Sequence, residues 1–197
     1  MTETATLPVT GEPDADHLLA SDPLALLLGM LLDQQVPMEW AFKAPSLLRD
    51  RLGGLDAVAI AAMSEAEVEA TFRAKPALHR YPGSMAKRAH ALCVHVVEAY
   101  GGDAAAIWTT ADSASELLAR LRALPGFGDE KSRIFLAVLG KRFAAAPDGW
   151  QEVAEPFGDD APRSVADVDS PETLQRVREW KKAQKAKGKT KSDRPAD

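Results

Sequence analysis

The stretch SASELLARLRALPGFGDEKSRIFLAVLGKRF, residues 113–143, determines the fold that we expect for this chain. Ser113 and Glu116 fit a capping box, in which a serine and a glutamate three residues later satisfy each other's exposed amides at the start of a helix. The segment Leu124-Pro125-Gly126-Phe127-Gly128 interrupts the helical pattern. A second helix is expected from about Asp129 to Phe143, with one face formed by Ile134, Phe135, Val138 and Leu139. The sequence therefore predicts two helices joined by a tight glycine turn.

The chemistry of this turn predicts a site for phosphate groups. Gly126 and Gly128 permit a positive φ and the close approach of an outside group, and Pro125 makes the entry to the turn rigid. Leu124 and Phe127 are expected to hold the two helices together, so that the turn amides and the positive start of the second helix face outward. Such amides bind the backbone of a nucleic acid without reading its bases. The alternative is a short helix connection that a proline and a glycine stabilise.

The first residues of the second helix oppose this prediction in charge. Asp129 and Glu130 suit a helix N-terminus but repel a phosphate. Lys131, Arg133 or a monovalent cation bound at the hairpin would have to offset them. We expect no other cofactor and no metal centre, and Lys131 is expected to contact DNA.

The rest of the chain shows repeated helix start signals and little strand alternation. These signals are Asp22-Pro23, Ser64 with Glu67, Ser84 before the helix that ends at Tyr100, and Ser170-Pro171. The apolar run LALLLGMLL after Pro23 predicts a buried central helix. We therefore expect an all-α protein, a two-lobed helical bundle with a cleft between the lobes. Its expected parts are a flexible arm at 1–12, a helical domain at 13–180 and a basic, disordered tail at 181–197.

Composition limits the classes of function. The 197 residues carry a net charge of −5, which argues against a nonspecific coat on nucleic acid, although basic residues dominate after Trp180. That basic segment is either a solvated terminus or a phosphate-binding arm. The single cysteine, Cys93, excludes an internal disulfide or a multi-cysteine cluster. The sequence shows neither a membrane span nor a secretory signal, so we expect a cytoplasmic protein.

From Asp22 to Trp150, the chain resembles the helix-hairpin-helix (HhH-GPD) DNA glycosylase superfamily, which includes endonuclease III and the alkyladenine glycosylases. The hairpin at Leu124–Gly128 carries the resemblance, together with Leu31-Leu32-Asp33-Gln34-Gln35-Val36. The second motif is similar to a buried helix that ends in a glutamine inserted into duplex DNA. The resemblance implies that Gln35 fills the gap left by an extruded base. Alternatively, Gln34 and Gln35 only end the helix before Pro37.

The resemblance also implies a reaction. Some members use a lysine after the hairpin as a nucleophile, but Glu130 occupies that position here, and Lys131 lies about 100° further around the helix and is expected to point elsewhere. A monofunctional glycosylase is implied, which hydrolyses the N-glycosidic bond of a damaged or mismatched base. The family's aspartate falls on Asp148, which would stabilise the sugar cation. However, Pro147-Asp148-Gly149 is also a turn sequence. The four-cysteine iron-sulfur loop of endonuclease III is absent.

Further residues are candidates for the walls of a base pocket, namely Gln34, Tyr81 and Trp150. His79-Arg80-Tyr81-Pro82, Lys87 and Arg88 offer basic and aromatic side chains for a pocket wall or for phosphate, although a solvated loop explains them equally. The expected partner is double-stranded DNA rather than a membrane, and the sequence indicates no protein partner. Two other functions remain open: a noncatalytic module that binds DNA structures, and a helical protein-interaction domain.

Overall fold

The computed structural model of the protein describes residues 6–188, which form helices without any strand. Its elements in chain order are α1 (Pro13–Ser21), α2 (Pro23–Leu32), α3 (Met38–Leu52), α4 (Ala57–Ala62), α5 (Glu65–Arg73), α6 (Pro82–Tyr100), α7 (Ala106–Thr109), α8 (Ala114–Ala123), α9 (Asp129–Phe143), α10 (Trp150–Val153), the 3-10 helix η1 (Val165–Asp167) and α11 (Pro171–Ala186). The all-α prediction is confirmed.

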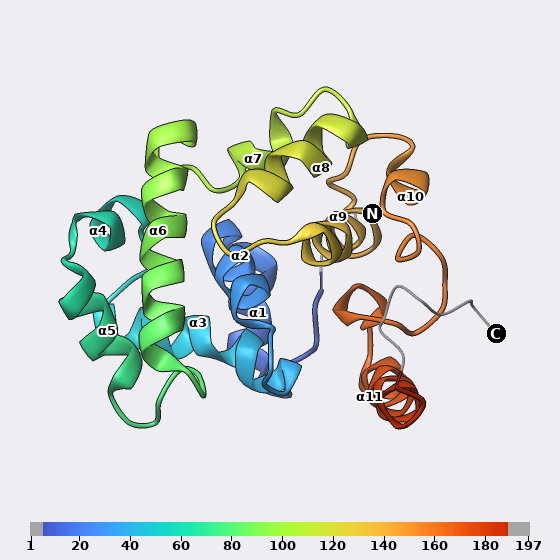
Figure 1. Cartoon of the computed structure of the whole chain (residues 1–197), viewed down its shortest axis with the longest axis horizontal. Helices are drawn as coiled ribbons and strands as arrows, with labels where there is room; N and C mark the ends of the chain where they lie inside the picture. The colour runs from blue at the N-terminus through green and yellow to red at the C-terminus, as the bar shows by residue number, and fades with distance from the viewer. Residues whose placement is uncertain (1–5, 189–197) are drawn as a thin grey trace.

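Two groups of helices lie on either side of α2 (Figure 1). In the first lobe, α6 packs against α4 and α5. In the second lobe, α9 packs against α8, α10 and η1, and α11 packs against η1. Helix α2 contacts α1, α3 and α6, and the loop between α8 and α9 passes beside it (Figure 1). The α2 segment therefore lies where the two lobes meet.

Local capping signals explain where several helices begin. The Asp22 side chain accepts hydrogen bonds from the amides of Leu24 and Ala25 at the start of α2. Ser64 and Glu67 form a capping box at α5, as expected. At α8, Ser113 accepts from the Glu116 amide, but Glu116 turns to the amide of Asp112 instead of Ser113. The expected reciprocal box is therefore only half formed.

The helix that we expected after Ser84 starts earlier, at Pro82. Proline is favoured in the first turn because that turn's amides have no helical acceptor. This helix, α6, buries Cys93 completely, and burial raises the pKa of the Cys93 thiol to about 12.

The buried core is continuous across both lobes. Residues 24–32 of α2 are all buried, and Gly29 lies so close to Phe42 that a Cβ on it would be 2.7 Å from the ring. This agrees with the central helix predicted from the apolar run. A large side chain on α2 would separate α2 from α3, because interiors are packed at crystal-like density.

The chain ends differ in detail from the expected boundaries. Within the segment expected as a flexible arm, Leu7 and Val9 are buried, and Asp16 accepts hydrogen bonds from the amides of Val9 and Thr10. At the other end, α11 continues through Lys181 to Ala186. The remainder of the expected arm, 1–5, and of the expected tail, 189–197, lies outside the described residues.

Within residues 6–188, no single helix is long and apolar enough to cross a membrane. The helices α1 and α2 meet that test only together, with a bend of 111° between them.

Candidate nucleic-acid interface

The hairpin between α8 and α9 has the geometry that its glycines and apolar residues predict. Gly126 adopts a φ of 84°, and the Phe127 amide donates to the Leu124 carbonyl at 3.1 Å. Leu124 and Phe127 are buried, with the Phe127 ring 6.1 Å from that of Phe135. These contacts fix the turn from inside the lobe and leave its backbone on the surface.

The two glycines of the turn play different structural roles. Of the two glycines that permit a positive φ, only Gly126 uses it, because Gly128 has a φ of −89°. Gly128 is the N-cap of α9, and a Cβ added to it would meet nothing within 4 Å. Because glycine has no side chain to cap the helix, the first-turn amides of α9 receive no side-chain acceptor at the cap. The amides of Gly126 and Gly128 also donate to no described acceptor. This cluster of open donors is the structural basis for an anion site.

The acidic start of α9 is neutralised in part by arginines. Asp129 accepts hydrogen bonds from Arg122, at 2.7 Å from Nε, and from Arg133 Nε at 3.0 Å. These bonds, that of Arg122 foremost, lower the pKa of the Asp129 carboxyl. The sequence suggested Arg133 as an offsetting charge, but not Arg122, which approaches from the preceding helix.

The Leu124 and Gly128 carbonyls already accept hydrogen bonds, from Phe127 and from Ser132 respectively. The monovalent cation at the hairpin remains a prediction. The two carbonyl oxygens that could bind it already accept hydrogen bonds within the protein.

The loop after α2 holds its two glutamines in different ways. Gln34 Nε2 donates to the Leu31 carbonyl at 2.8 Å, and Gln34 Oε1 accepts from Arg88 at 2.7 Å. Gln35 is exposed, has a φ of 57°, and makes no side-chain hydrogen bond to a described residue. Gln34 is therefore a fixed part of the wall, and Gln35 is the glutamine that is available to an outside molecule.

The hairpin and the glutamine loop are in direct contact. A Cβ on Gly126 would lie 2.5 Å from Leu31 Cδ1 and 3.6 Å from Arg88 Cδ. Lys131 extends from α9 so that its Nζ donates to the Leu31 carbonyl at 2.6 Å. Our expectation that Lys131 points elsewhere is therefore wrong. The rotation of a side chain about its own helix does not determine its surroundings, because these depend on how that helix packs against α2.

Beside Gln35 lies a pocket of about 250 Å³, lined by Gln34, Gln35, His79, Tyr81, Ser84, Met85 and Arg88. This volume is below the roughly 300–1,000 Å³ of pockets that hold drug-sized ligands, and suits a smaller planar group. The pocket joins the end of α2 to the start of α6. Its lining includes Gln34 and Tyr81, two of the three residues that the sequence suggested as pocket walls, together with Gln35 and with Arg88 from the weaker group of basic residues.

His79, which the sequence offered only as one of the weaker candidates at 79–82, is the buried support of this pocket. Its Nε2 lies 3.0 Å from the Gln34 carbonyl, and its Nδ1 accepts from the Tyr81 amide at 3.0 Å. Because a carbonyl only accepts, Nε2 carries the proton and the ring is neutral. Burial lowers the pKa of His79, and the positive charges of Lys131 and Arg88 lower it further. One neutral ring therefore links the glutamine loop to the Tyr81 loop.

Aromatic rings extend from the pocket onto the surface. The His79 ring centroid lies 6.1 Å from that of Tyr81 and 6.4 Å from that of Trp40. Tyr81 is 43% exposed and Trp40 37% exposed. The guanidinium of Arg80 lies 5.4 Å from the centre of the Tyr81 ring. Exposed rings next to cations are typical of surfaces that stack nucleobases.

The structure does not bring Asp148 or Trp150 to this pocket. Asp148 is exposed in a turn after α9, and Trp150 packs on Gly140 near the end of that helix. The contacts with Leu31 and Arg88 are made at the opposite end, at the start of α9. Since α9 has 15 residues, its two ends are about 22 Å apart.

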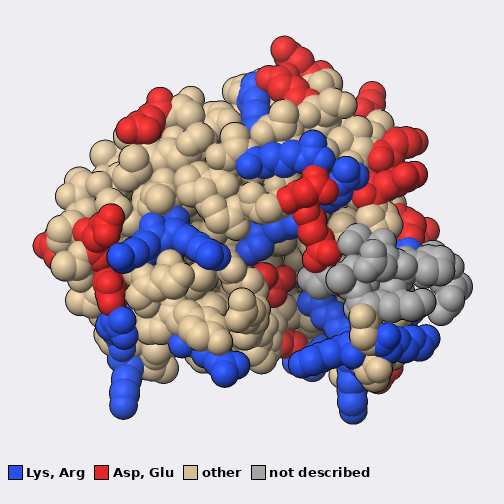
Figure 2. Space-filling model, viewed as in Figure 1, with Lys and Arg blue, Asp and Glu red and all other residues tan. Residues whose placement is uncertain are grey.

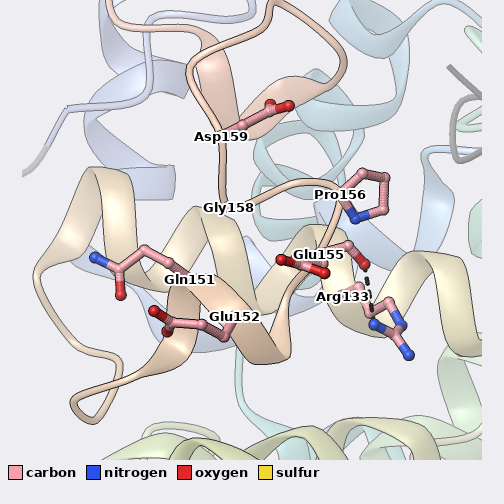
Figure 3. Close-up of a pocket in the computed structure, with 7 residues that line it drawn as sticks. All are labelled: Arg133, Gln151, Glu152, Glu155, Pro156, Gly158 and Asp159. Carbon is pink, nitrogen blue, oxygen red and sulfur yellow. Dashed lines mark hydrogen bonds between the residues drawn. The ribbon is translucent and has the colours of Figure 1, made fainter. Parts of the chain in front are cut away.

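A larger hollow of about 600 Å³ lies on the outer side of α9 (Figure 3). Gln151 and Glu152 of α10 line it, with Glu155, Pro156, Gly158 and Asp159 from the following loop and Arg133 from α9. Arg133 is turned to the carbonyls of Val153 and Glu155. The three carboxylates make this hollow unsuitable for phosphate, and none of the site residues predicted from sequence lines it.

Surface charge differs between the two regions. Figure 2 shows basic side chains over α6 and around the α8–α9 hairpin, where acidic side chains adjoin them, and further acidic side chains toward α10. The negative net charge of −5 thus coexists with a local basic surface next to the pocket.

Comparison with models of protein families gives a match. A family model described as HhH-GPD superfamily base excision DNA repair protein matches residues 28–194. No curated protein matches the chain. Among residues 6–188, no group of three or more histidine, cysteine, aspartate or glutamate side chains is placed to hold a metal ion.

Proposed function

Because the chain belongs to the HhH-GPD superfamily of base excision DNA repair proteins, we propose that it extrudes a damaged or mismatched base from double-stranded DNA and hydrolyses its N-glycosidic bond. In this proposal, the open amides of Gly126 and Gly128 hold a phosphate, Gln35 fills the vacated place in the duplex, and the pocket beside it receives the base.

The contact of the hairpin with the glutamine loop is the observation that carries this proposal. Gly126, Leu31 and Arg88 lie against one another, so a strand held at the hairpin runs directly past Gln35. The pocket opens at the same place and is lined by the exposed Tyr81 ring. In this proposal, the hairpin amides that hold a phosphate, the inserted Gln35 and the base pocket therefore contact adjacent nucleotides of one strand.

Two observations favour a monofunctional enzyme. Glu130 stands where lyase-competent relatives have a lysine, and a carboxylate forms no Schiff base. Lys131 does approach the site, but its Nζ is held by a hydrogen bond to the Leu31 carbonyl, so attack on the sugar would require Nζ to leave this acceptor. We accordingly propose that water completes the reaction and that an abasic site remains. The proposal includes no iron-sulfur cluster.

The test is release of bases from duplexes that each contain one lesion or mismatch. We expect release of at least one base by the wild type, and strong reduction in Arg88→Ala and Tyr81→Ala. Borohydride should trap no protein–DNA adduct. A trapped adduct that disappears in Lys131→Gln would replace hydrolysis by lyase chemistry at Lys131.

The position of Asp148 favours a second candidate, a noncatalytic module that binds distorted or abasic DNA. Asp148 follows the end of α9 that lies away from Gln35, and the described pocket lining holds no carboxylate. Under the glycosylase proposal, we expect the Asp148→Asn variant to release bases at the wild-type rate, because Asp148 does not reach the pocket. Loss of release in this variant would restore Asp148 as the catalyst. Tight binding of abasic duplex without release of any base would select the noncatalytic module.

A further inference from the structure

The charge of the pocket beside Gln35 limits the kind of base that it accepts. The described lining contains one permanently charged side chain, Arg88, and no aspartate or glutamate. Arg88 donates to Gln34 Oε1 and to no other described residue, so its remaining N–H groups are available to a bound molecule. Asp33, which directly precedes Gln34 in the chain, is not part of the lining.

A second cation reaches the same region from α9. The Nζ of Lys131 lies 2.6 Å from the carbonyl of Leu31, which also accepts a hydrogen bond from Nε2 of the lining residue Gln34. The neutral His79 ring cannot offset these charges; its pKa is lowered mainly by burial and further by the positive charges of Lys131 and Arg88. The ring of Tyr81 would attract a cation, but Arg80 already lies over it at 5.4 Å.

We infer that, given the proposed glycosylase function, the substrates are uncharged bases that depart as anions, and that bases with a fixed positive charge, such as N-alkylated purines, are rejected. A cationic base would meet Arg88 and Lys131 without any carboxylate in the lining. For an uncharged base, the bond from its nitrogen to C1′ breaks with both electrons on the base. Water then adds its hydroxyl to C1′, and its proton neutralises the departed base through solvent. Arg88 and Lys131 stabilise the negative charge that develops on the base in between.

A site without a carboxylate can still lower the barrier to breaking the N-glycosidic bond. A glycosylase lowers its barrier by stabilising either the sugar cation or the leaving base. The described pocket offers groups only for the leaving base, whereas the phosphates of the bound DNA supply negative charge near the sugar.

The experiment compares release from duplexes with uncharged lesions (uracil, hypoxanthine, 8-oxoguanine) and with cationic lesions (7-methylguanine, 3-methyladenine). Each rate is divided by the spontaneous rate in the same duplex. We expect the enhancement for at least one uncharged lesion to exceed that for both cationic lesions by about tenfold or more. Equal or greater enhancement for cationic lesions would overturn the inference while leaving the glycosylase function intact.

Failure of the proposed function gives a different result, namely no release of any base. Binding to duplexes with a non-cleavable 2′-fluoro sugar then tests the inference alone. The 2′-fluorouridine duplex should bind more tightly than the 2′-fluoro-7-methylguanosine duplex, and the opposite order would overturn the inference.

A matched pair at Ser84 tests the pocket charge directly. Ser84 is exposed, lines the pocket and occupies the first turn of α6, where an aspartate is compatible with the positive end of the helix. Ser84→Asp should raise release of cationic relative to uncharged lesions by about tenfold, since it places a carboxylate at the pocket. Ser84→Asn, with nearly the same shape, should leave the ratio unchanged. A ratio that is equal in the two variants would contradict the inference.

A second pair separates the pocket charge from general attraction to DNA. Arg88→Met and Lys87→Met each remove one positive charge from an exposed position on α6, but only Arg88 lines the pocket. The ratio should shift toward cationic lesions in Arg88→Met, while in Lys87→Met the two rates should change together. The same shift in both variants would assign selectivity to overall charge and refute the inference.

Discussion

At Gln35, the backbone has a φ of 57°, which lies in the left-handed region that residues other than glycine rarely adopt. The exposed side chain makes no hydrogen bond to a described residue that would compensate for this strain. Residues held in this way occur at ligand-binding sites, where the strain positions a group before the ligand arrives. The conformation therefore supports Gln35, rather than Gln34, as the residue that enters the duplex.

Two replacements of Gln35 separate strain from DNA contact. Gln35→Gly and Gln35→Ala both remove the side chain, so both should weaken binding to a duplex with an abasic gap. Only glycine relieves the backbone strain, so Gln35→Gly should be about 1 kcal/mol more stable to unfolding than Gln35→Ala. Urea denaturation and fluorescence anisotropy measure the two effects. Wild-type affinity of both variants for the abasic duplex would remove Gln35 from the interface.

His79 makes the stability of the protein depend on pH in a definite direction. Its pKa in the folded protein is lowered from 6.5, mainly by burial, so the unfolded chain binds the proton more readily. The stabilisation is fully present above 6.5 and is lost as the pH falls through and below that value. Protonation would also remove Nδ1 as acceptor of the Tyr81 amide.

We expect the free energy of unfolding to fall less between pH about 7.5 and about 5.5 in His79→Gln than in the wild type. His17→Gln changes an exposed histidine and serves as the control. An unchanged slope in His79→Gln would show that other groups cause the acid sensitivity.

At the scale of the helix elements, the two glycines of the α8–α9 turn have different roles: Gly126 is needed for the fold, and Gly128 leaves space for a phosphate. Gly126→Ala should destabilise the fold by about 1–2 kcal/mol or more, because alanine is strained at a φ of 84° and its Cβ would meet Leu31. Gly128→Ala should leave stability within about 0.5 kcal/mol but weaken duplex binding, because its Cβ would occupy the space where a phosphate approaches. Thermal denaturation and duplex titration distinguish the two. Unchanged binding by Gly128→Ala would contradict the phosphate site.

Element boundaries were predictable wherever a local signal decides them. The range of α9 agrees with the prediction from its apolar face, and Asp22, Ser64 and Ser170 cap the helices that they were expected to cap. The partner of Glu116 and the direction of Lys131 were not predictable. Glu116 chooses between two neighbouring amides at the start of one helix, and the direction of Lys131 depends on how α9 packs against α2.

At the scale of the whole molecule, a buried ion pair joins the hairpin lobe to the C-terminal segment. Lys141 of α9 and Asp167 of η1 are 10% and 8% exposed, with 2.6 Å between Nζ and Oδ1. Because removal of one partner leaves a buried charge, Lys141→Met should destabilise the protein by about 3 kcal/mol. Arg49→Met, which breaks the exposed pair with Asp50, should cost less than about 1 kcal/mol. Equal effects of the two changes would mean that Asp167 is satisfied without Lys141, through its bonds from Arg163 and Ser164.

In the candidate site, the residues of short motifs were predictable from sequence, whereas the contacts between the two lobes were not. The hairpin and Gln35 were identified from short motifs, and the pocket residue Tyr81 from its loop. His79 was named only together with its neighbours at 79–82, and its role was not predictable because it joins the loop after α2 to the loop before α6, 45 residues apart in sequence. Asp148 was located by counting along the chain, and counting does not show which segments pack beside the residues that follow a 15-residue helix.

The complete burial of Cys93 makes its thiol a probe for local opening of the protein. Cys93 is the only cysteine in the chain, and its thiol, with a pKa of about 12, is scarcely ionised near neutral pH. A thiolate-specific reagent can therefore react only in the moments when α6 leaves the core. The rate of labelling counts those openings, and its change on addition of a lesion duplex reports how firmly bound DNA holds the α6 lobe closed.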